Sequence, residues 1–312
     1  MNRAVVFAYH NVGVRCLKAL LAGGVEVALV VTHADHPAET IWYDSVHRTA
    51  EDYGLPCITP DDPNADAVLQ RIRALDVDFV FSFYYRHMLQ APLLACARRG
   101  AYNVHGSLLP KYRGRVPINW AILHGETETG ASLHRMNEKP DNGALVDQMA
   151  VPILPDDSAF EVFAKVTVAA EIVLLRSLPK LLDGSAVLTP QDLNQGAYFG
   201  ARSAADGRID WQQPARRIHD LVRAVTKPFP GAFCEMERGR LTLWKTRVSR
   251  EASSADSPSL FLRHDKLHAR CGDGAVLHIL YAELDGAAFD AVVWRHSGFP
   301  PVLPLHPSHP KS

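Results

Sequence analysis

Short apolar runs alternate with helical patterns through the first hundred residues, and this alternation restricts the fold more than any other feature of the sequence. The runs are rich in β-branched and aromatic residues and lie at 3–9, 26–32, 55–59 and 78–83. Strands that are apolar throughout, with helices between them, are typical of a parallel sheet covered on both faces. Because crossover connections are right-handed, we expect an α/β fold with a doubly wound, mostly parallel, Rossmann-like sheet.

The second half of the sequence predicts a smaller, β-rich domain. A helical pattern at 158–182 is followed by a stretch without periodicity, and short strand-like runs recur after residue 240. Such runs suit a β-barrel of the OB-like kind. We therefore expect an N-terminal α/β domain, a linker, a β-barrel-like domain and a disordered proline-rich tail, at residues 1–189, 190–205, 206–298 and 299–312.

Charge and cysteine usage exclude several classes of protein. A formal net charge of -1 lacks the basic excess of a dedicated nucleic-acid binder. No apolar run approaches the roughly 20 residues that span a bilayer, and the N-terminus does not resemble a secretory leader. The five cysteines lie far apart and form no C-x-x-C pair, so neither a zinc site nor a disulfide framework is indicated. We expect a cytoplasmic protein without a metal site.

Polar segments follow three of the expected strands, at residues 9–13, 84–87 and 103–107. Ligands of doubly wound sheets bind outside the carboxyl ends of the strands, and those ends meet at one edge. The sequence thus predicts a binding site at that edge, with Tyr9, His10 and Asn11 as candidate substrate contacts.

Asn103 and His105 lie two residues apart at the end of one strand, so their side chains project to the same side. An amide and an imidazole held together suit acyl transfer. The Asn103 N–H groups can stabilise an oxyanion, and His105 can polarise a carbonyl or relay a proton. Ser107 is a candidate to orient the imidazole. The spacing alone is equally compatible with a loop histidine whose ring is satisfied by backbone groups.

Asp141 is the third candidate, in the polar loop of residues 137–143. A carboxylate beside His105 would raise its basicity and hold its tautomer, and could take a proton from an attacking amine through a water. The sequence Asp-Asn-Gly is also a strong signal for a hairpin turn. Composition alone favours the turn.

The stretch NVHGSLLP from Asn103 to Pro110, followed by the DNG of residues 141–143, resembles the formyltransferase family that uses 10-formyltetrahydrofolate. This family includes methionyl-tRNA formyltransferase, glycinamide ribonucleotide formyltransferase and the sugar N-formyltransferases. The resemblance implies the formyltransferase fold, 10-formyltetrahydrofolate as the formyl donor, and Asn103, His105 and Asp141 as the catalytic trio. It implies no metal.

Three further stretches are similar to the formyltransferase domain of the bifunctional polymyxin-resistance enzymes, namely FAYH from Phe7, FSFYYRH from Phe81 and HGSLLPKYRGR from His105. This likeness implies UDP-4-amino-4-deoxy-L-arabinose as the acceptor, in the lipid A modification that confers antibiotic resistance. The substrates would then be two small molecules, a folate and a nucleotide-sugar.

The resemblance also implies binding residues. Those expected to contact the folate are His87, Met88, Leu89, Arg115, Asn137, Glu138, Lys139, Pro140 and Asp141. Lys111 and Arg113, with Arg115, form a basic loop that could hold the pyrophosphate of a nucleotide-sugar or the glutamate tail of the folate. A solvated basic loop explains Lys111 and Arg113 equally well. The segment of residues 33–43, which holds His33, Trp42 and Tyr43, is a candidate acceptor-side or lid segment.

Other functions fit parts of the pattern. Methionyl-tRNA formyltransferase shares the trio, but the neutral charge and the lack of a basic linker weigh against tRNA binding. A hydrolase of formyltetrahydrofolate is a third enzyme that fits, and a non-catalytic folate or nucleotide-sugar binding module is the alternative from another class. The complete trio counts against the last. The sequence has neither G-x-G-x-x-G nor a Tyr-x-x-x-Lys pair, so a nicotinamide cofactor is not implied.

Overall fold

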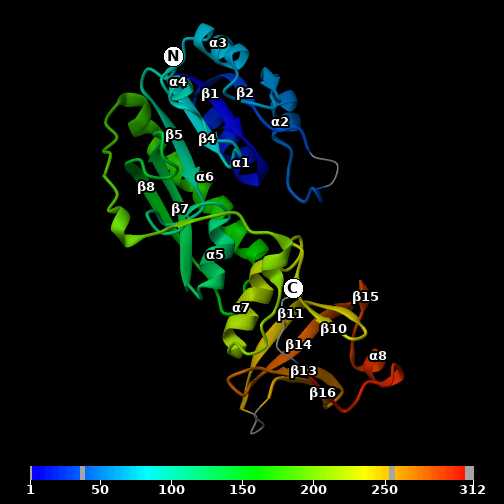
Figure 1. The fold of residues 1–312 in the computed structure, drawn as a ribbon. Coiled ribbons are helices and arrows are strands. Elements are labelled where there is room, and N and C mark those ends of the chain that lie inside the picture. The colour runs from blue at the N-terminus through cyan, green and yellow to red at the C-terminus, as the bar shows by residue number, and fades with distance from the viewer. Residues whose placement is uncertain (1, 36–38, 253–256, 306–312) are drawn as a thin grey trace. The chain divides into compact units, whose positions relative to one another are not determined.

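The computed structural model describes residues 2–35, 39–252 and 257–305 (Figure 1). The chain forms two compact units, which are described separately below. Unit 1 comprises Met1–Pro117, Glu128–Pro152 and Phe163–Gly200, and unit 2 comprises Ile118–Thr127, Ile153–Val162 and Ala201–Ser312.

A mixed sheet forms the centre of unit 1, and its strands follow the order β3-β2-β1-β4-β5-β7-β8. The five parallel strands are β1 (Arg3–Ala8), β2 (Glu26–Val31), β3 (Cys57–Ile58), β4 (Phe79–Phe83) and β5 (Gly100–His105). Two antiparallel strands, β7 (Glu128–Arg135) and β8 (Leu145–Pro152), complete the edge beyond β5. The expected mostly parallel α/β sheet is confirmed.

Helices cover both faces of this sheet. They are α1 (His10–Ala22), α2 (Val46–Asp52), α3 (Asp66–Ala74), α4 (Ala91–Leu94) and α6 (Ala159–Asp183). On one face, Val5 and Phe7 of β1 pack in a core cluster with Ile72 of α3 and Leu93 of α4. Helix α1 makes an ion pair with α6 through Arg15 and Glu171 at 2.6 Å. Because successive residues of a strand point to opposite faces, the fully apolar strand sequence follows from this double cover.

The strand order reverses between β1 and β4. The chain runs outward from β1 through β2 to β3, and then returns to the other side of β1 with β4 and β5. This reversal is the topological switch point at which ligands of such sheets bind. It brings the segment after β1 beside the segment after β4, and the Tyr9 N–H donates to the Phe83 carbonyl at 3.0 Å.

The hairpin of β7 and β8 contains the loop that carries Asp141. The loop joins Arg135, the last residue of β7, to Leu145, the first residue of β8. Gly143 lies against the backbone of Arg135 near the end of this loop. A Cβ atom at position 143 would lie 1.7 Å from the Arg135 carbonyl oxygen. The glycine is therefore required by the close approach of two backbone segments.

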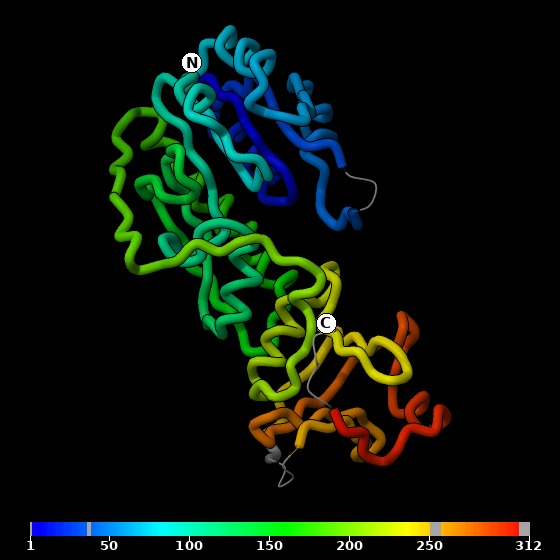
Figure 2. Tube along the Cα trace, viewed as in Figure 1, coloured from blue at the N-terminus to red at the C-terminus, as the bar shows by residue number. Residues whose placement is uncertain are grey.

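The segment expected as a linker is ordered and returns along unit 1. It contains η1 (Leu193–Gln195) and β9 (Tyr198–Phe199), and β9 pairs in parallel with the short strand β6 (Arg113–Gly114). Figure 2 shows the extended course of this segment.

Unit 2 is built on a curled antiparallel sheet in the order β10-β11-β14-β13-β12-β16. Its strands are β10 (Ala232–Met236), β11 (Gly239–Ala252), β12 (Ser259–Arg263), β13 (Lys266–Arg270), β14 (Ala275–Leu284), β15 (Ala287–Ala288) and β16 (Val302–Pro304). Its helical elements are α5 (Pro117–Leu123), η2 (Ala204–Gly207), α7 (Ala215–Val225) and α8 (Ala291–His296). The expected β-rich C-terminal fold is confirmed.

Part of the proline-rich segment expected to be disordered is instead ordered. Residues Val302–Pro304 form β16, which pairs with β12. Strand β16 lies at the end of the sheet, where a proline interrupts no ladder on its outer side. Residues 306–312 lie outside the described residues.

Candidate active site

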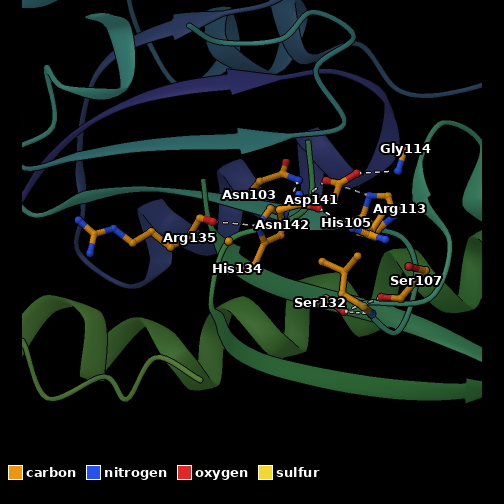
Figure 3. Close-up of polar contacts among 12 residues, drawn as sticks. Asn103, His105, Ser107, Arg113, Gly114, Ser132, His134, Arg135, Asp141 and Asn142 are labelled. Carbon is orange, nitrogen blue, oxygen red and sulfur yellow. Dashed lines mark hydrogen bonds and ion pairs between the residues drawn. The ribbon is translucent and has the colours of Figure 1, made fainter. Parts of the chain in front are cut away.

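Strand β5 presents Asn103 and His105 at the edge of unit 1. In the antiparallel pairing with β7, Asn103 lies opposite His134 and His105 lies opposite Ser132. Directly opposed residues of two strands share a face, so the side chains of Asn103, His105 and His134 gather on one side of the sheet (Figure 3). The Asn103 Nδ2 and His134 Nε2 atoms are 3.0 Å apart.

Asp141 joins this group from the β7–β8 loop. Its Oδ1 atom lies 3.5 Å from His105 Nδ1 and 3.5 Å from His134 Nε2, and its Oδ2 atom accepts a hydrogen bond from the Gly114 N–H at 2.8 Å. The Asp141 side chain is 11% exposed. The structure therefore brings all three members of the expected trio together and adds His134 (Figure 3).

The Asp141 carboxyl is held in its charged form. Burial alone would raise its pKa, but the His105 imidazole, the contact with His134 and the Gly114 N–H together outweigh burial. The pKa of Asp141 consequently lies well below its usual range. A buried carboxylate of this kind stabilises positive charge that develops on the His105 imidazole.

Backbone carbonyls determine the tautomers of the two histidines. The His105 Nε2 atom lies 2.8 Å from the Tyr112 carbonyl oxygen, and the His134 Nδ1 atom lies 3.0 Å from the Arg135 carbonyl oxygen. Since a carbonyl only accepts, these two nitrogens carry protons. The Tyr112 carbonyl, rather than Asp141, thus holds the His105 tautomer. Both His105 nitrogens contact protein groups, which favours proton relay over direct polarisation of a substrate carbonyl.

Ser107 does not orient His105, contrary to expectation. Its hydroxyl donates to the Lys111 carbonyl at 2.6 Å, while the Ser132 hydroxyl donates to the Ser107 carbonyl at 2.6 Å. The Gln148 amide adds hydrogen bonds to Ser132 and to the Leu109 carbonyl. These contacts brace the loop after β5, and the sequence does not indicate them because they depend on the pairing of β5, β7 and β8.

The basic loop is only partly open to a ligand. Arg113 donates to Asn142 Oδ1 at 2.8 Å and to the Gly196 carbonyl at 3.1 Å, so its guanidinium braces two loops. The expected role of Arg113 as an anion contact stays a prediction. Lys111 and Arg115 are both exposed.

The segment after β1 meets the segment of residues 33–45. The Tyr9 hydroxyl donates to Asp35 at 2.8 Å and accepts from Tyr43 at 2.7 Å, and Asn11 Oδ1 accepts from the Asp44 N–H at 2.7 Å. Asn11 therefore anchors this segment, and Tyr9 is 4% exposed. Residues 36–38 lie outside the described residues.

His10 is enclosed by aromatic rings. Its ring centroid lies 3.9 Å from that of Tyr43, 4.5 Å from that of Trp42 and 4.6 Å from that of Phe163. Burial, with a smaller contribution from the Arg86 charge, lowers the pKa of His10 to about 3. His10 is thus neutral near pH 7, and its Nδ1 atom has no hydrogen-bond partner among the described residues.

The residues expected to contact the folate divide into two groups. Asn137, Glu138 and Lys139 line an open depression of about 460 Å³ whose other walls are Ala91, Leu94 and Met136. His87 and Met88 are exposed, whereas Leu89 is buried in the core cluster. The Leu89 side chain therefore belongs to the core of unit 1.

Backbone strain is concentrated around this edge of the sheet. Five non-glycine residues on the segments described above have positive φ angles, namely His10 (67°), Tyr84 (57°), Tyr112 (55°), Val116 (46°) and Asp141 (56°). For a β-branched residue such as Val116 this conformation is a clear outlier. Strain of this kind persists where surrounding contacts impose it and is common at functional sites.

Comparison with known proteins accounts for this arrangement. Residues 2–178 match the family model described as formyl transferase, and residues 202–294 match the model described as formyl transferase, C-terminal domain. The chain belongs to the formyl transferase family. Its predicted activity class, a formyltransferase, is confirmed.

Solved structures with the same fold include several formyltransferases. The N-formyltransferase from Helicobacter canadensis, in complex with folinic acid and dTDP-3-aminofucose, has a TM-score of 0.71 and 18% identity, over 89% of this chain and 99% of that one. The sugar 3N-formyl transferase WlaRD, with dTDP and 5-N-formyl-THF, has a TM-score of 0.71 and 18% identity, over 89% and 97%. A 4-N formyltransferase from Francisella tularensis has a TM-score of 0.61 and 19% identity, over 76% and 93%.

The described residues of this formyltransferase contain neither a metal-binding cluster nor a membrane-spanning helix. In residues 2–35, 39–252 and 257–305, no group of three or more His, Cys, Asp or Glu side chains is placed to hold a metal ion. Over the same ranges, no helix combines the length and the apolar character needed to cross a membrane.

Proposed function

We propose that this formyltransferase moves the formyl group of 10-formyltetrahydrofolate to the amine of a nucleotide-linked amino sugar, with UDP-4-amino-4-deoxy-L-arabinose as the acceptor. The main support is the buried Asp141 carboxylate, placed 3.5 Å from both His105 and His134 and beside Asn103. A protein that only binds folate needs no such assembly. All of these residues lie in unit 1, within the predicted N-terminal domain of residues 1–189.

The neutral amine of the acceptor attacks the formyl carbon, and a carbon–nitrogen bond forms as the carbonyl π electrons move to oxygen. The Asn103 carboxamide donates a hydrogen bond to this oxyanion. The former amine nitrogen, now positively charged, loses a proton toward the His105–Asp141 pair through a water. The bond between the formyl carbon and N10 then breaks, N10 receives a proton, and tetrahydrofolate and the formamido sugar are released.

His105 suits the proton-relay step. Its Nε2 proton is committed to the Tyr112 carbonyl, so Nδ1, on the Asp141 side, is the atom that takes up a proton. The imidazolium that forms is then stabilised by the adjacent carboxylate. The shallow depression lined by Asn137, Glu138 and Lys139 is proposed to receive the pterin part of the folate.

The choice of acceptor depends on the FAYH, FSFYYRH and HGSLLPKYRGR stretches, which resemble the enzymes that formylate UDP-4-amino-4-deoxy-L-arabinose during lipid A modification. Two of the solved structures named above contain dTDP or a dTDP-linked amino sugar. The solved structures and the sequence resemblance both support a nucleotide-linked amino sugar as the acceptor. The choice of UDP-4-amino-4-deoxy-L-arabinose depends on the sequence resemblance alone.

An acceptor screen tests both levels of the proposal. The protein is incubated with 10-formyltetrahydrofolate and, separately, with UDP-4-amino-4-deoxy-L-arabinose, a dTDP-amino sugar or charged initiator tRNA, and tetrahydrofolate release is measured. We expect the highest kcat/KM with the UDP sugar. Preference for the dTDP sugar would overturn the choice of nucleotide and sugar, and turnover with tRNA alone would overturn the whole proposal.

A further inference from the structure

His134 was not among the residues that the sequence singled out, yet it contacts both Asn103 and Asp141 of the expected trio. It lies on β7 opposite Asn103 and is 2% exposed. One ring nitrogen, Nδ1, faces the Arg135 carbonyl at 3.0 Å. The other, Nε2, lies 3.0 Å from Asn103 Nδ2 and 3.5 Å from Asp141 Oδ1.

These contacts define the state of the neutral ring. The Arg135 carbonyl requires a proton on Nδ1, which leaves a lone pair on Nε2. A lone pair is the acceptor that the Asn103 carboxamide nitrogen needs at 3.0 Å. Asp141 Oδ1 lies 3.5 Å from the same Nε2 atom, beyond the usual N–H···O hydrogen-bond length of about 2.7–3.2 Å, so Asn103 is the closer partner. A proton on Nε2 would instead favour the amide with its oxygen toward His134. The state of Nε2 therefore determines which end of the Asn103 amide faces His134.

The orientation of this amide matters for transfer. A carboxamide nitrogen carries two hydrogens, so Asn103 can donate one to His134 and direct the other toward the oxyanion. Turning the amide by half a revolution would place its acceptor oxygen where this donor had been. An oxygen facing an oxyanion repels it, whereas a preorganised donor stabilises it.

We propose that His134 is a positioning residue for formyl transfer, whose unprotonated Nε2 atom fixes the Asn103 carboxamide with its nitrogen available to the oxyanion. The inference rests on the proposed role of Asn103. His134 acts through Asn103 and does not touch the substrate. Removing one oxyanion donor lowers kcat by about 10²–10³-fold in well-studied enzymes, so misorienting it is expected to cost about 10–100-fold.

Two substitutions separate positioning from simple packing. His134→Gln places an amide oxygen within reach of the Nε2 position, so it can still accept from Asn103. His134→Leu keeps comparable volume but removes the acceptor. We expect His134→Gln to retain kcat within a few-fold and His134→Leu to lose about 10–100-fold in kcat, with the KM values for both substrates unchanged. Equal losses in the two variants would overturn the proposal.

A matched control addresses the loss of any buried histidine. His219 is also 2% exposed, lies in unit 2 and bonds to Thr246 and to the Pro155 carbonyl. We expect His219→Leu to lower the melting temperature without lowering kcat. If it reduces kcat as strongly as His134→Leu does, the effect on turnover is a general result of destabilisation and the proposal fails.

A spectroscopic test does not depend on turnover. With ¹⁵N-labelled histidine, NMR should show one protonated and one unprotonated nitrogen for His134, and the Asn103 side-chain amide signals should shift in His134→Leu but far less in His134→Gln. A proton on Nε2 in the wild-type protein would overturn the inference. This NMR measurement separates the positioning role of His134 from the proposed formyl-transfer function. An inactive wild-type enzyme with the expected spectrum would refute the proposed function alone.

Discussion

The Gly114 backbone N–H donates a hydrogen bond of 2.8 Å to Asp141 Oδ2, so a two-residue strand positions the carboxylate of the candidate site. Gly114 has a φ of 100°, and a Cβ atom there would lie 2.3 Å from the Phe199 carbonyl oxygen. Because β6 pairs with β9, the segment of residues 190–200 helps to hold the Gly114 N–H in place against the Asp141 carboxylate.

Gly114→Ala is expected to lower kcat by about 10-fold or more, because the added methyl group must displace Phe199 or draw the N–H away from Asp141. Steady-state kinetics and thermal unfolding would measure the two effects. Gly24→Ala is the matched control, since Gly24 also has a positive φ (77°) but no atom lies within 4 Å of its Cβ position. The prediction is wrong if both variants lose the same fraction of kcat.

His105→Ala should remove formyl transfer almost completely while folate binding is retained. General acid–base groups contribute about 10²–10⁴-fold, and the His105 ring contacts both the Tyr112 carbonyl and Asp141. Single-turnover rates and equilibrium binding of folinic acid would separate the two effects. Unchanged turnover would refute the proposed role of His105.

His10 is expected to make the protein less stable as the pH falls. Its pKa is lowered to about 3 in the folded state, against about 6.5 in an unfolded chain, so between these values the unfolded state binds one more proton. Stability therefore decreases from pH 6.5 downward, with a limiting slope of about 1.4 kcal/mol per pH unit.

Denaturant unfolding at several pH values should show a shallower pH dependence for His10→Phe than for the wild type. Val187→Ala, at an exposed position that does not titrate, serves as the control and should leave the slope unchanged. Parallel curves for wild type and His10→Phe would contradict the buried, neutral state of His10.

Arg113→Met should destabilise the protein without weakening its affinity for nucleotide-sugar, because the guanidinium bonds to Asn142 and to the Gly196 carbonyl. Lys111→Met, at an exposed position of the same loop, provides the comparison. Melting temperatures and acceptor KM values would be measured for both. A large rise in KM for Arg113→Met at an unchanged melting temperature would restore Arg113 as an anion contact.

Much of the fold could be predicted because its signals are local. The apolar runs predicted β1, β2 and β4, and the helical pattern of residues 158–182 coincides with α6. Helices α5 and α8, at seven and six residues, are too short to produce a recognisable apolar period. The end of the chain was expected to be disordered from its prolines, yet β16 forms because an edge position tolerates them.

The placement of Asn103 and His105 on one face could be predicted from the amino-acid sequence alone, because alternate residues of a strand share a face. The sequence also supplied the family motif that connects Asp141 to them. Three relationships became visible only in the folded chain. His134 lies opposite Asn103, the Tyr112 carbonyl rather than Ser107 contacts the His105 ring, and Arg113 bonds to two loops. These relationships depend on the register between β5 and β7 and on how distant loops fold back. Neither is encoded in the spacing of neighbouring residues.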